Sequence, residues 1–212
     1  MARPVRHPLF ARVYSRLRPG IDRQGALAHR RRLLAGLSGR VLEVGAGDGG
    51  NFAHYPPEVT GVVAVEPEPY LRAQATRRAM EAPVPIEVVD GVADRLPVDD
   101  GAVDAAVVSL VLCSVPDQAA ALAELHRALR PGGELRFFEH VAADTPGLLR
   151  VQAVVDRTLW PLLCGGCHTG RDTVAAIGAA GFAVEEVDRF RFPPDGPAAP
   201  ATPHALGRAR RA

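Results

Sequence analysis

The feature that most constrains this chain is a Val-rich run that leads directly into a cluster of glycines, VLEVGAGDGG at residues 41–50. The apolar run predicts a buried strand over 41–44. Glycines placed directly after a strand let the backbone turn sharply, and they let a ligand lie against bare peptide amides where any side chain would collide. We therefore expect a ligand site at the end of this strand.

Short Val-rich runs alternate with helix-patterned segments along the rest of the chain. This alternation is typical of an α/β protein with a mostly parallel sheet buried on both faces. The predicted strands are 41–44, 61–65, 86–89, 105–110, 134–139 and 184–190, and the predicted helices are 70–80, 118–129, 148–162 and 173–180. Two more helices are expected ahead of the first strand, at 8–18 and 22–37. A chain of 212 residues suits one layered unit of this kind.

The glycine cluster alone fits two classes of ligand. Gly45, Gly47 and Gly50 satisfy the G-x-G-x-x-G pattern of dinucleotide-binding proteins, so an NAD-dependent oxidoreductase is one candidate. Glu43, inside the strand, suits a cationic amino-acid ligand such as S-adenosylmethionine (SAM) better than a pyrophosphate. Glu66 follows the second predicted strand and can accept hydrogen bonds from ribose hydroxyls in either case. A dehydrogenase would also need a substrate domain beyond residue 190, where a Pro/Ala-rich segment follows, so we favour SAM.

Five motifs together resemble the class I SAM-dependent methyltransferases, of the subgroup that includes the ubiquinone and menaquinone C-methyltransferases. They are the glycine turn, Glu66, DGVADRLP at 90–97, the predicted strand at 103–112 and LRPGG at 129–133. The resemblance runs from about residue 40 to residue 190. It implies a single Rossmann-like domain over residues 40–212, with a seven-stranded sheet, helices on both faces and an antiparallel last strand. Residues 1–39 are then N-terminal helices that cover the substrate.

The same resemblance implies which residues bind the cofactor. They are Glu43, Gly45, Ala46, Gly47 and Asn51 at the methionine end, Glu66 and Pro67 at the ribose, Gly91, Val92 and Ala93 at the adenine, and Leu110 and Cys113 beside them. The family more often has an acid at the position of Val92, and this chain departs from the pattern there.

A narrower resemblance, to the methyltransferase-like alkyl-thiol methyltransferases, rests on LVLCSVP at 110–116, FEHVAA at 138–143 and GCHTGRDT at 166–173, and PHALG at 203–207 is similar to their last strand. It implies a small lipophilic acceptor, with a thiol as the main candidate. Carbon or oxygen methylation of a quinone-like or secondary metabolite is the alternative. Membrane-associated members carry an apolar N-terminal anchor, and this sequence does not show one. The apolar residues Leu159, Trp160, Leu162 and Leu163 are expected either in the core or in the wall of an acceptor pocket.

Methyl transfer from a sulfonium is an in-line displacement on an activated electrophile, so such an enzyme mainly aligns donor and acceptor and excludes water. Ligands of open α/β sheets bind beyond the carboxyl ends of the strands. His140 is there the candidate catalytic base or orienting group, and a histidine that caps the strand is the alternative. His168 and Arg171 are the further catalytic candidates and are expected to face the acceptor. The alternative for Arg171 is a local pair with Asp172 or with a helix end.

The segment CGGCH at 164–168 spells the attachment pattern of c-type haem, but no export signal precedes it and we do not expect haem. Cys164, Cys167 and His168 would give three zinc ligands. No fourth ligand is evident in the sequence, so no metal is expected either. The three cysteines are predicted to be reduced thiols. No apolar stretch approaches the roughly 20 residues of a membrane span, and we expect a cytoplasmic protein.

Charge is unevenly distributed: residues 1–40 hold ten arginines against one acid, Asp22, in a chain of formal net charge +1. Such a segment can mark a surface for nucleic acid or anionic membrane. It lacks interleaved aromatic residues and a binding motif, so we expect a solvated face and no nucleic-acid partner. A non-catalytic SAM-binding protein that contacts nucleic acid through this segment is the remaining alternative. Both a monomer and a homodimer are compatible with the sequence.

Overall fold

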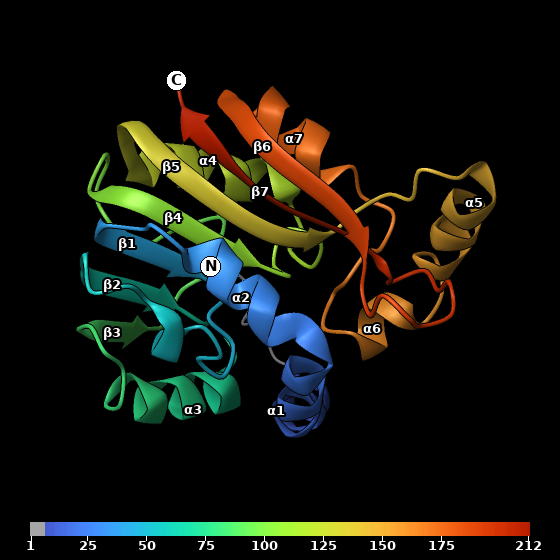
Figure 1. Ribbon diagram of the computed structural model, residues 1–212, viewed down its shortest axis with the longest axis horizontal. Coiled ribbons are helices and arrows are strands. Elements are labelled where there is room, and N and C mark those ends of the chain that lie inside the picture. Colours follow the sequence, from blue (N-terminus) through green and yellow to red (C-terminus); the bar gives the residue numbers. More distant parts are fainter. Residues whose placement is uncertain (1–6) are drawn as a thin grey trace.

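Seven strands form one sheet in the order β3-β2-β1-β4-β5-β7-β6 in the computed structural model, which describes residues 7–212 (Figure 1). The strands are β1 (Gly39–Val44), β2 (Val59–Val65), β3 (Ile86–Val89), β4 (Val103–Ser109), β5 (Leu129–His140), β6 (Phe182–Arg191) and β7 (Pro203–Arg211). The strand β7 is antiparallel to both of its neighbours, and the other pairings are parallel. The predicted seven-stranded Rossmann-like sheet with an antiparallel last strand is confirmed.

Helices cover both faces of this sheet. They are α1 (Pro8–Ile21), α2 (Leu27–Leu34), α3 (Pro69–Ala79), α4 (Gln118–Ala128), α5 (Pro146–Val155), α6 (Trp160–Leu163) and α7 (Thr173–Ala179), with a π-helical turn at Asp22–Ala26 and a short 3-10 helix at Phe52–His54. The helices α4 and α7 pack on one face, and α2 and α3 pack on the other. The helix α1 projects beyond the sheet on the side where α6 also lies (Figure 1).

The central strands read as continuous apolar runs because both of their faces are buried. In β1, Leu42 and Val44 contribute to the core beneath α4 and α7, whereas Val41 contributes to the core beneath α2 and α3. Alternate residues of β4 divide between the same two cores, with Ala106 on one side and Val107 on the other. The sheet is therefore fixed from both sides, and its carboxyl edge is a rigid platform for a site.

Three helices begin at carboxylates that accept a hydrogen bond from a free backbone N–H of the first turn. Asp117 accepts from Ala120, and Asp172 accepts from Ala175. Glu68 accepts from Leu71 in the same way at the start of α3. These caps fix where each helix enters the fold.

The predicted helix at 148–162 is wrong, because the structure divides it into α5 and α6. The division lies at Asp156, whose carboxylate accepts hydrogen bonds from the backbone N–H groups of Thr169 and Gly170 at 2.7 and 2.9 Å. This tertiary contact anchors the turn that ends α5. The predicted helix at 22–37 is also shorter, because Gly25, with φ of 120°, interrupts helical geometry near its start.

Candidate active site

The glycine turn lies where β1 ends, and three of its glycines have backbone conformations that side chains disfavour. Gly45, Gly47 and Gly49 have φ values of 68°, 59° and 79°. A Cβ atom on Gly45 would come within 3 Å of one methyl group of Val111 and would lie 3.3 Å from the other. The backbone N–H of Gly45 donates to the carbonyl oxygen of Val65 at 2.8 Å. The turn is thus held between the end of β2 and the loop that follows β4.

Glu66 joins the glycine turn to the end of β2. Its Oε2 accepts a hydrogen bond from the backbone N–H of Gly47, and its Oε1 accepts one from Glu68, both at 2.8 Å. The side chain is buried, and burial raises the pKa of Glu66 to about 7 although these two N–H groups oppose the shift. Each carboxylate oxygen has capacity for another hydrogen bond. A carboxyl group with this geometry can accept from a ligand's hydroxyl groups beside the turn.

Glu43 and Asn51 belong to a buried network at the turn. The Glu43 carboxylate accepts from Asn51 Nδ2 at 2.8 Å and from the Tyr55 hydroxyl at 2.7 Å. Burial raises the pKa of Glu43 to about 7. Asn51 Oδ1 in turn accepts from Arg30 NH1 at 3.0 Å. Both predicted binding side chains are therefore engaged with protein groups, and the partners Tyr55 and Arg30 gave no recognisable signal in the sequence.

Ion pairs tie the N-terminal helices to this turn. Asp48 Oδ2 accepts from Arg18 Nε at 2.8 Å and forms an ion pair with Arg78 NH1 at 2.6 Å. Asp22 pairs with Arg18 and also with Arg30 Nε, the latter at 3.1 Å. The side chains of Arg18 and Arg30 are only 13% and 8% exposed. The expectation of a wholly solvated basic face is therefore wrong for these two arginines.

Aromatic residues of α1 reach both sides of the site. The Tyr14 ring would lie 3.6 Å from a Cβ atom on Gly47, and the Phe10 ring would lie 2.8 Å from one on Gly165. The two rings stack on each other with centroids 5.7 Å apart. Val13 is exposed on the same helix, so the apolar side chains of α1 are only partly covered. The helix α1 spans from the glycine turn to the loop that follows α6.

The segment expected at the adenine follows β3. Gly91 has no room for a side chain, because a Cβ atom there would lie 2.9 Å from Val65 Cγ1. Val92 pairs with Arg95 in an isolated bridge, and Ala93 packs partly against the core between them. The segment is thus a tight turn next to the end of β2. Pro67, expected at the ribose, follows Glu66 directly in the chain.

The loop after β4 is fixed by a buried acid at the end of β5. Glu139 is 0% exposed, and its carboxylate accepts hydrogen bonds from the backbone N–H groups of Val111, Leu112 and Cys113 at 2.9, 3.0 and 3.1 Å. Burial raises the pKa of Glu139, while the three N–H groups oppose that shift. Leu110, where the loop begins, has a left-handed φ of 60°. The sequence placed Glu139 near the site but did not indicate that it orders this loop.

The loop at 164–171 docks on the same segment. The backbone N–H of His168 donates to the Cys113 carbonyl oxygen at 2.8 Å. Arg171 NH1 donates to the carbonyl oxygens of Leu112 and Val115 at 2.8 and 2.7 Å. Among the residues that the structure describes, Arg171 forms no ion pair with Asp172, and its NH2 lies 3.4 Å from His168 Nδ1. That Arg171 and His168 face the acceptor stays a prediction. His168 Nδ1 lies 2.8 Å from the Gly166 carbonyl oxygen, and the residue lines a surface groove of about 410 Å³.

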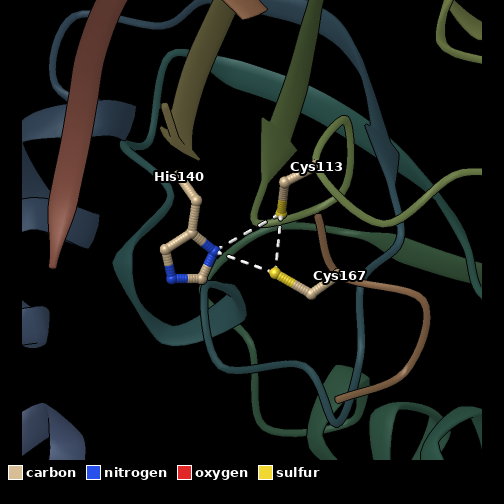
Figure 2. A group of neighbouring side chains, drawn as sticks. All are labelled: Cys113, His140 and Cys167. Atoms are coloured by element: carbon tan, nitrogen blue, oxygen red, sulfur yellow. Dashed lines mark hydrogen bonds between the residues drawn. The ribbon is translucent and has the colours of Figure 1, made fainter. Parts of the chain in front are cut away.

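Docking of the two loops brings three side chains together at the carboxyl edge of the sheet. Figure 2 shows Cys113, His140 and Cys167 pointing toward one another from three different segments. The two Sγ atoms lie 3.9 Å apart, and His140 Nδ1 lies 3.5 Å from Cys113 Sγ and 3.4 Å from Cys167 Sγ. Cys164 and His168, the other residues of the C-x-x-C-H pattern, are not members of this cluster. We call these three residues the thiol–imidazole cluster.

The two thiols of the cluster differ in acidity. The hydrogen bond with Cys113 lowers the pKa of Cys167, and contacts with His140 and Trp160 lower it further. The hydrogen bond with Cys167 raises the pKa of Cys113, and burial adds to this effect. Behind the cluster, the His204 ring packs 4.5 Å from that of His140. Burial lowers the pKa of His204 to about 3, so His204 is neutral at physiological pH.

The leucines around α6 do not belong to the core. Leu159, Leu162 and Leu163 are 66%, 71% and 65% exposed, so of the two expectations only the wall of an acceptor pocket stays a prediction. Trp160 is partly buried. Within residues 7–212, no helix is long and apolar enough to cross a membrane.

Comparisons with known proteins agree with this geometry. The family model described as a methyltransferase domain matches residues 42–137. The chain is 36% identical to the human thiol S-methyltransferase TMT1B over 181 residues, which cover 83% of this chain and 73% of TMT1B. It is also 36% identical to human TMT1A over 166 residues, covering 75% and 67% of the two chains. A solved SAM-dependent methyltransferase from Thermotoga maritima superposes with a TM-score of 0.70, covering 96% of this chain and 97% of that one at 21% identity.

These matches exclude the oxidoreductase that the glycine spacing also allowed, and they establish SAM as the cofactor. The chain belongs to the family of SAM-dependent methyltransferases that includes the thiol S-methyltransferases TMT1A and TMT1B.

Proposed function

We propose that this enzyme transfers the methyl group of SAM to the sulfur atom of a small lipophilic thiol. The observation that carries the proposal is the 36% identity with a thiol S-methyltransferase over 83% of the chain. The two segments that form the thiol–imidazole cluster with His140, the loop after β4 and the loop at 164–171, also belong to the motifs that resemble alkyl-thiol methyltransferases. The enzyme would convert the thiol to a thioether.

The residues around the glycine turn fit the cofactor. The absence of a side chain at Gly45 makes room for Val111 to pack against the turn, and the adjacent carboxyl group of Glu66 can accept from ribose hydroxyls. We assign the adenine to Gly91, Val92 and Ala93, at the neighbouring strand end. Leu110, Ala46 and Pro67 complete the wall.

Glu43 and Asn51 act as positioning residues in this proposal. Their side chains are buried and bonded to Tyr55 and Arg30, so they would hold the turn in shape and contact the methionine end through backbone groups at most. This revises the direct contacts expected from the sequence. Arg171 is a positioning residue for the same reason, because its guanidinium is bonded to backbone carbonyl oxygens of the loop after β4.

SAM supplies an activated methyl group when it is bound, so the protein must exclude water and prepare the acceptor. The stacked rings of Phe10 and Tyr14 lie between the glycine turn and the loop at 164–171, which suits a cover over the bound reactants. This supports a covering role for residues 1–39. A thiol acceptor must lose its proton to become a good nucleophile, and we assign that step to the thiol–imidazole cluster.

The test is to incubate the full chain with methyl-labelled SAM and pairs of acceptors that differ in one atom, such as octanethiol and octanol, together with phenols and quinols. We expect labelled S-methyl octyl thioether and no labelled ether, with products identified by mass spectrometry. A labelled C- or O-methyl quinol, with no thioether formed from any thiol, would overturn the proposal and favour the quinone-type alternative.

A further inference from the structure

The thiol–imidazole cluster contains three groups that commonly bind metal ions. Within the described part of the chain, Cys113, His140 and Cys167 form one group whose ligand atoms all lie within 4.8 Å of one another. Cys113 and Cys167 are 0% and 6% exposed, and His140 is partly buried. In Figure 2 the Nδ1 edge of the imidazole faces the two sulfur atoms, so all three potential ligands converge on one point.

The distances agree with tetrahedral zinc coordination. Bond lengths of about 2.3 Å for Zn–S and about 2.0–2.1 Å for Zn–N place two sulfur ligands about 3.8 Å apart and a sulfur and a nitrogen about 3.5 Å apart. The observed separations are 3.9 Å between the sulfur atoms and 3.5 and 3.4 Å from each sulfur to Nδ1. An ion at the common centre would therefore meet all three ligands with almost no rearrangement.

We propose that Cys113, His140 and Cys167 bind a thiophilic divalent cation such as zinc through two sulfur atoms and Nδ1. A disulfide explains the arrangement less well, because S–S bonding at about 2.0 Å would require the sulfur atoms to approach by almost 2 Å. A disulfide would also not explain why the imidazole of His140 points toward both sulfur atoms.

Neighbouring groups hold Cys113 and His140 in place. Glu139 accepts from the N–H of Cys113, and the N–H of His168 donates to the carbonyl oxygen of the same cysteine. The packed ring of His204 limits rotation of His140. Trp160 Nε1 is buried with no hydrogen-bond partner among the described residues. Such outer contacts orient the ligands of protein metal sites.

Three protein ligands leave the fourth tetrahedral position open, which is the arrangement of catalytic rather than structural zinc. The cluster adjoins the cofactor side, because Val111, two residues before Cys113, contacts Gly45. We infer that the sulfur of the acceptor thiol occupies the fourth position, and this step rests on the proposed function. The thiol would lose its proton to solvent on binding the metal, because metal coordination deprotonates a thiol.

The reaction then balances. The metal-bound thiolate sulfur donates an electron pair to the methyl carbon, and the bond from that carbon to the sulfonium sulfur breaks. The products are a neutral thioether, which leaves the metal, and S-adenosylhomocysteine. Overall one thiol proton is released for each methyl group transferred, and no oxidant or reductant is needed.

Metal binding is tested without SAM or acceptor, on the full chain reduced with a phosphine so that no added thiol fills the open position. After treatment with a chelator, the protein is titrated with Zn²⁺ and separately with Co²⁺. We expect one equivalent to bind, with a thiolate-to-cobalt charge-transfer band and the intense visible bands of a tetrahedral ion. Cys113→Ser, Cys167→Ser and His140→Ala should each weaken binding by about 100-fold or more, since even outer-contact changes cost 10–100-fold.

Cys164→Ser and His168→Ala are the matched controls, because both residues belong to the C-x-x-C-H pattern but lie outside the cluster. Both should retain the affinity and the cobalt spectrum of the wild type. X-ray absorption of the zinc-loaded wild type, which needs no variant to fold, should show two sulfur ligands and one imidazole. The metal site is overturned if the wild type binds no metal, or if the control variants lose the metal while the cluster variants keep it.

The fourth ligand is tested by adding octanethiol or octanol to the cobalt-loaded protein. We expect octanethiol alone to strengthen the charge-transfer band. If added thiols leave the spectrum of the cobalt-loaded protein unchanged, the fourth-ligand role is overturned, even if the enzyme methylates thiols. Conversely, if thiols change the cobalt spectrum but the protein makes no thioether, the metal site is supported and the proposed function is overturned. The two failures are therefore distinguishable.

Discussion

Replacing Gly45 with alanine tests whether the glycine turn needs bare backbone at this point. Gly45 has a left-handed φ of 68°, and a Cβ atom there would come within 3 Å of one Val111 methyl group and lie 3.3 Å from the other. Carbon atoms in contact are normally about 3.5–4.0 Å apart, so either Val111 or the turn must move by at least about 0.5 Å. The loop after β4, which carries Val111, would then shift as well.

The expected cost has two parts. A left-handed conformation costs an alanine about 1–2 kcal/mol, and forcing a methyl group into a packed site costs about 1–3 kcal/mol. Gly36 provides the matched control, because its φ is 74° and nothing lies within 4 Å of the added Cβ. Gly36→Ala therefore carries the conformational part alone. We expect Gly45→Ala to destabilise the protein by about 1–3 kcal/mol more than Gly36→Ala.

The measurement is the free energy of unfolding in urea, followed by circular dichroism, with calorimetry of S-adenosylhomocysteine binding on the folded variants. Val111→Ala in the Gly45→Ala background removes the overlapping methyl groups, so the double variant should recover most of the excess cost. Gly36→Ala should leave binding unchanged, whereas Gly45→Ala should weaken it. Equal destabilisation by the two glycine substitutions, or no recovery in the double variant, would refute the packing argument.

Two further predictions concern charges around the turn. Because the pKa of Glu66 is raised to about 7 from an ordinary 4.5, its protonated form stabilises the fold below pH 4.5, and this contribution of up to about 3 kcal/mol is lost as pH rises through 7. In urea unfolding, the free energy of unfolding of Glu66→Gln relative to wild type should therefore rise by that amount from pH 4 to pH 8. A difference between the two proteins that does not change with pH would contradict the burial argument. Asp48→Asn removes the shared partner of Arg18 and Arg78. We expect it to destabilise the protein by about 2–3 kcal/mol in urea unfolding and to increase cleavage of α1 in limited trypsin digestion. Unchanged cleavage in α1 would show that the ion pairs do not hold that helix.

The fold could largely be predicted from the sequence, because strands buried on both faces leave apolar runs that are hard to mistake. The run at 41–44 became most of β1, and the acids at Asp117 and Asp172 begin helices as their capping chemistry predicts. The interruption between α5 and α6 could not be predicted in this way. It depends on the contact of Asp156 with Thr169 and Gly170, which are thirteen and fourteen residues further along the chain.

The candidate site shows the same division. The glycine turn and Glu66 follow from local sequence, since both lie at strand ends whose positions the pattern gives. The thiol–imidazole cluster does not follow from local sequence, because the pattern C-x-x-C-H pairs Cys167 with its neighbours Cys164 and His168. The fold instead pairs Cys167 with Cys113 and His140, which come from other segments.

The loop after β4 connects the two halves of the site. Its Val111 methyl groups pack against Gly45 at the glycine turn, and its Cys113 belongs to the thiol–imidazole cluster. Glu139 accepts from the backbone N–H groups of both residues and of Leu112 between them, so the loop must move largely as one body. In-line transfer requires donor and acceptor to be aligned within a fraction of an ångström. Under the proposed function, a single buried carboxylate that orders this whole loop would set that alignment, which gives a reason for an acid at the end of β5 to be buried although burial disfavours its charge.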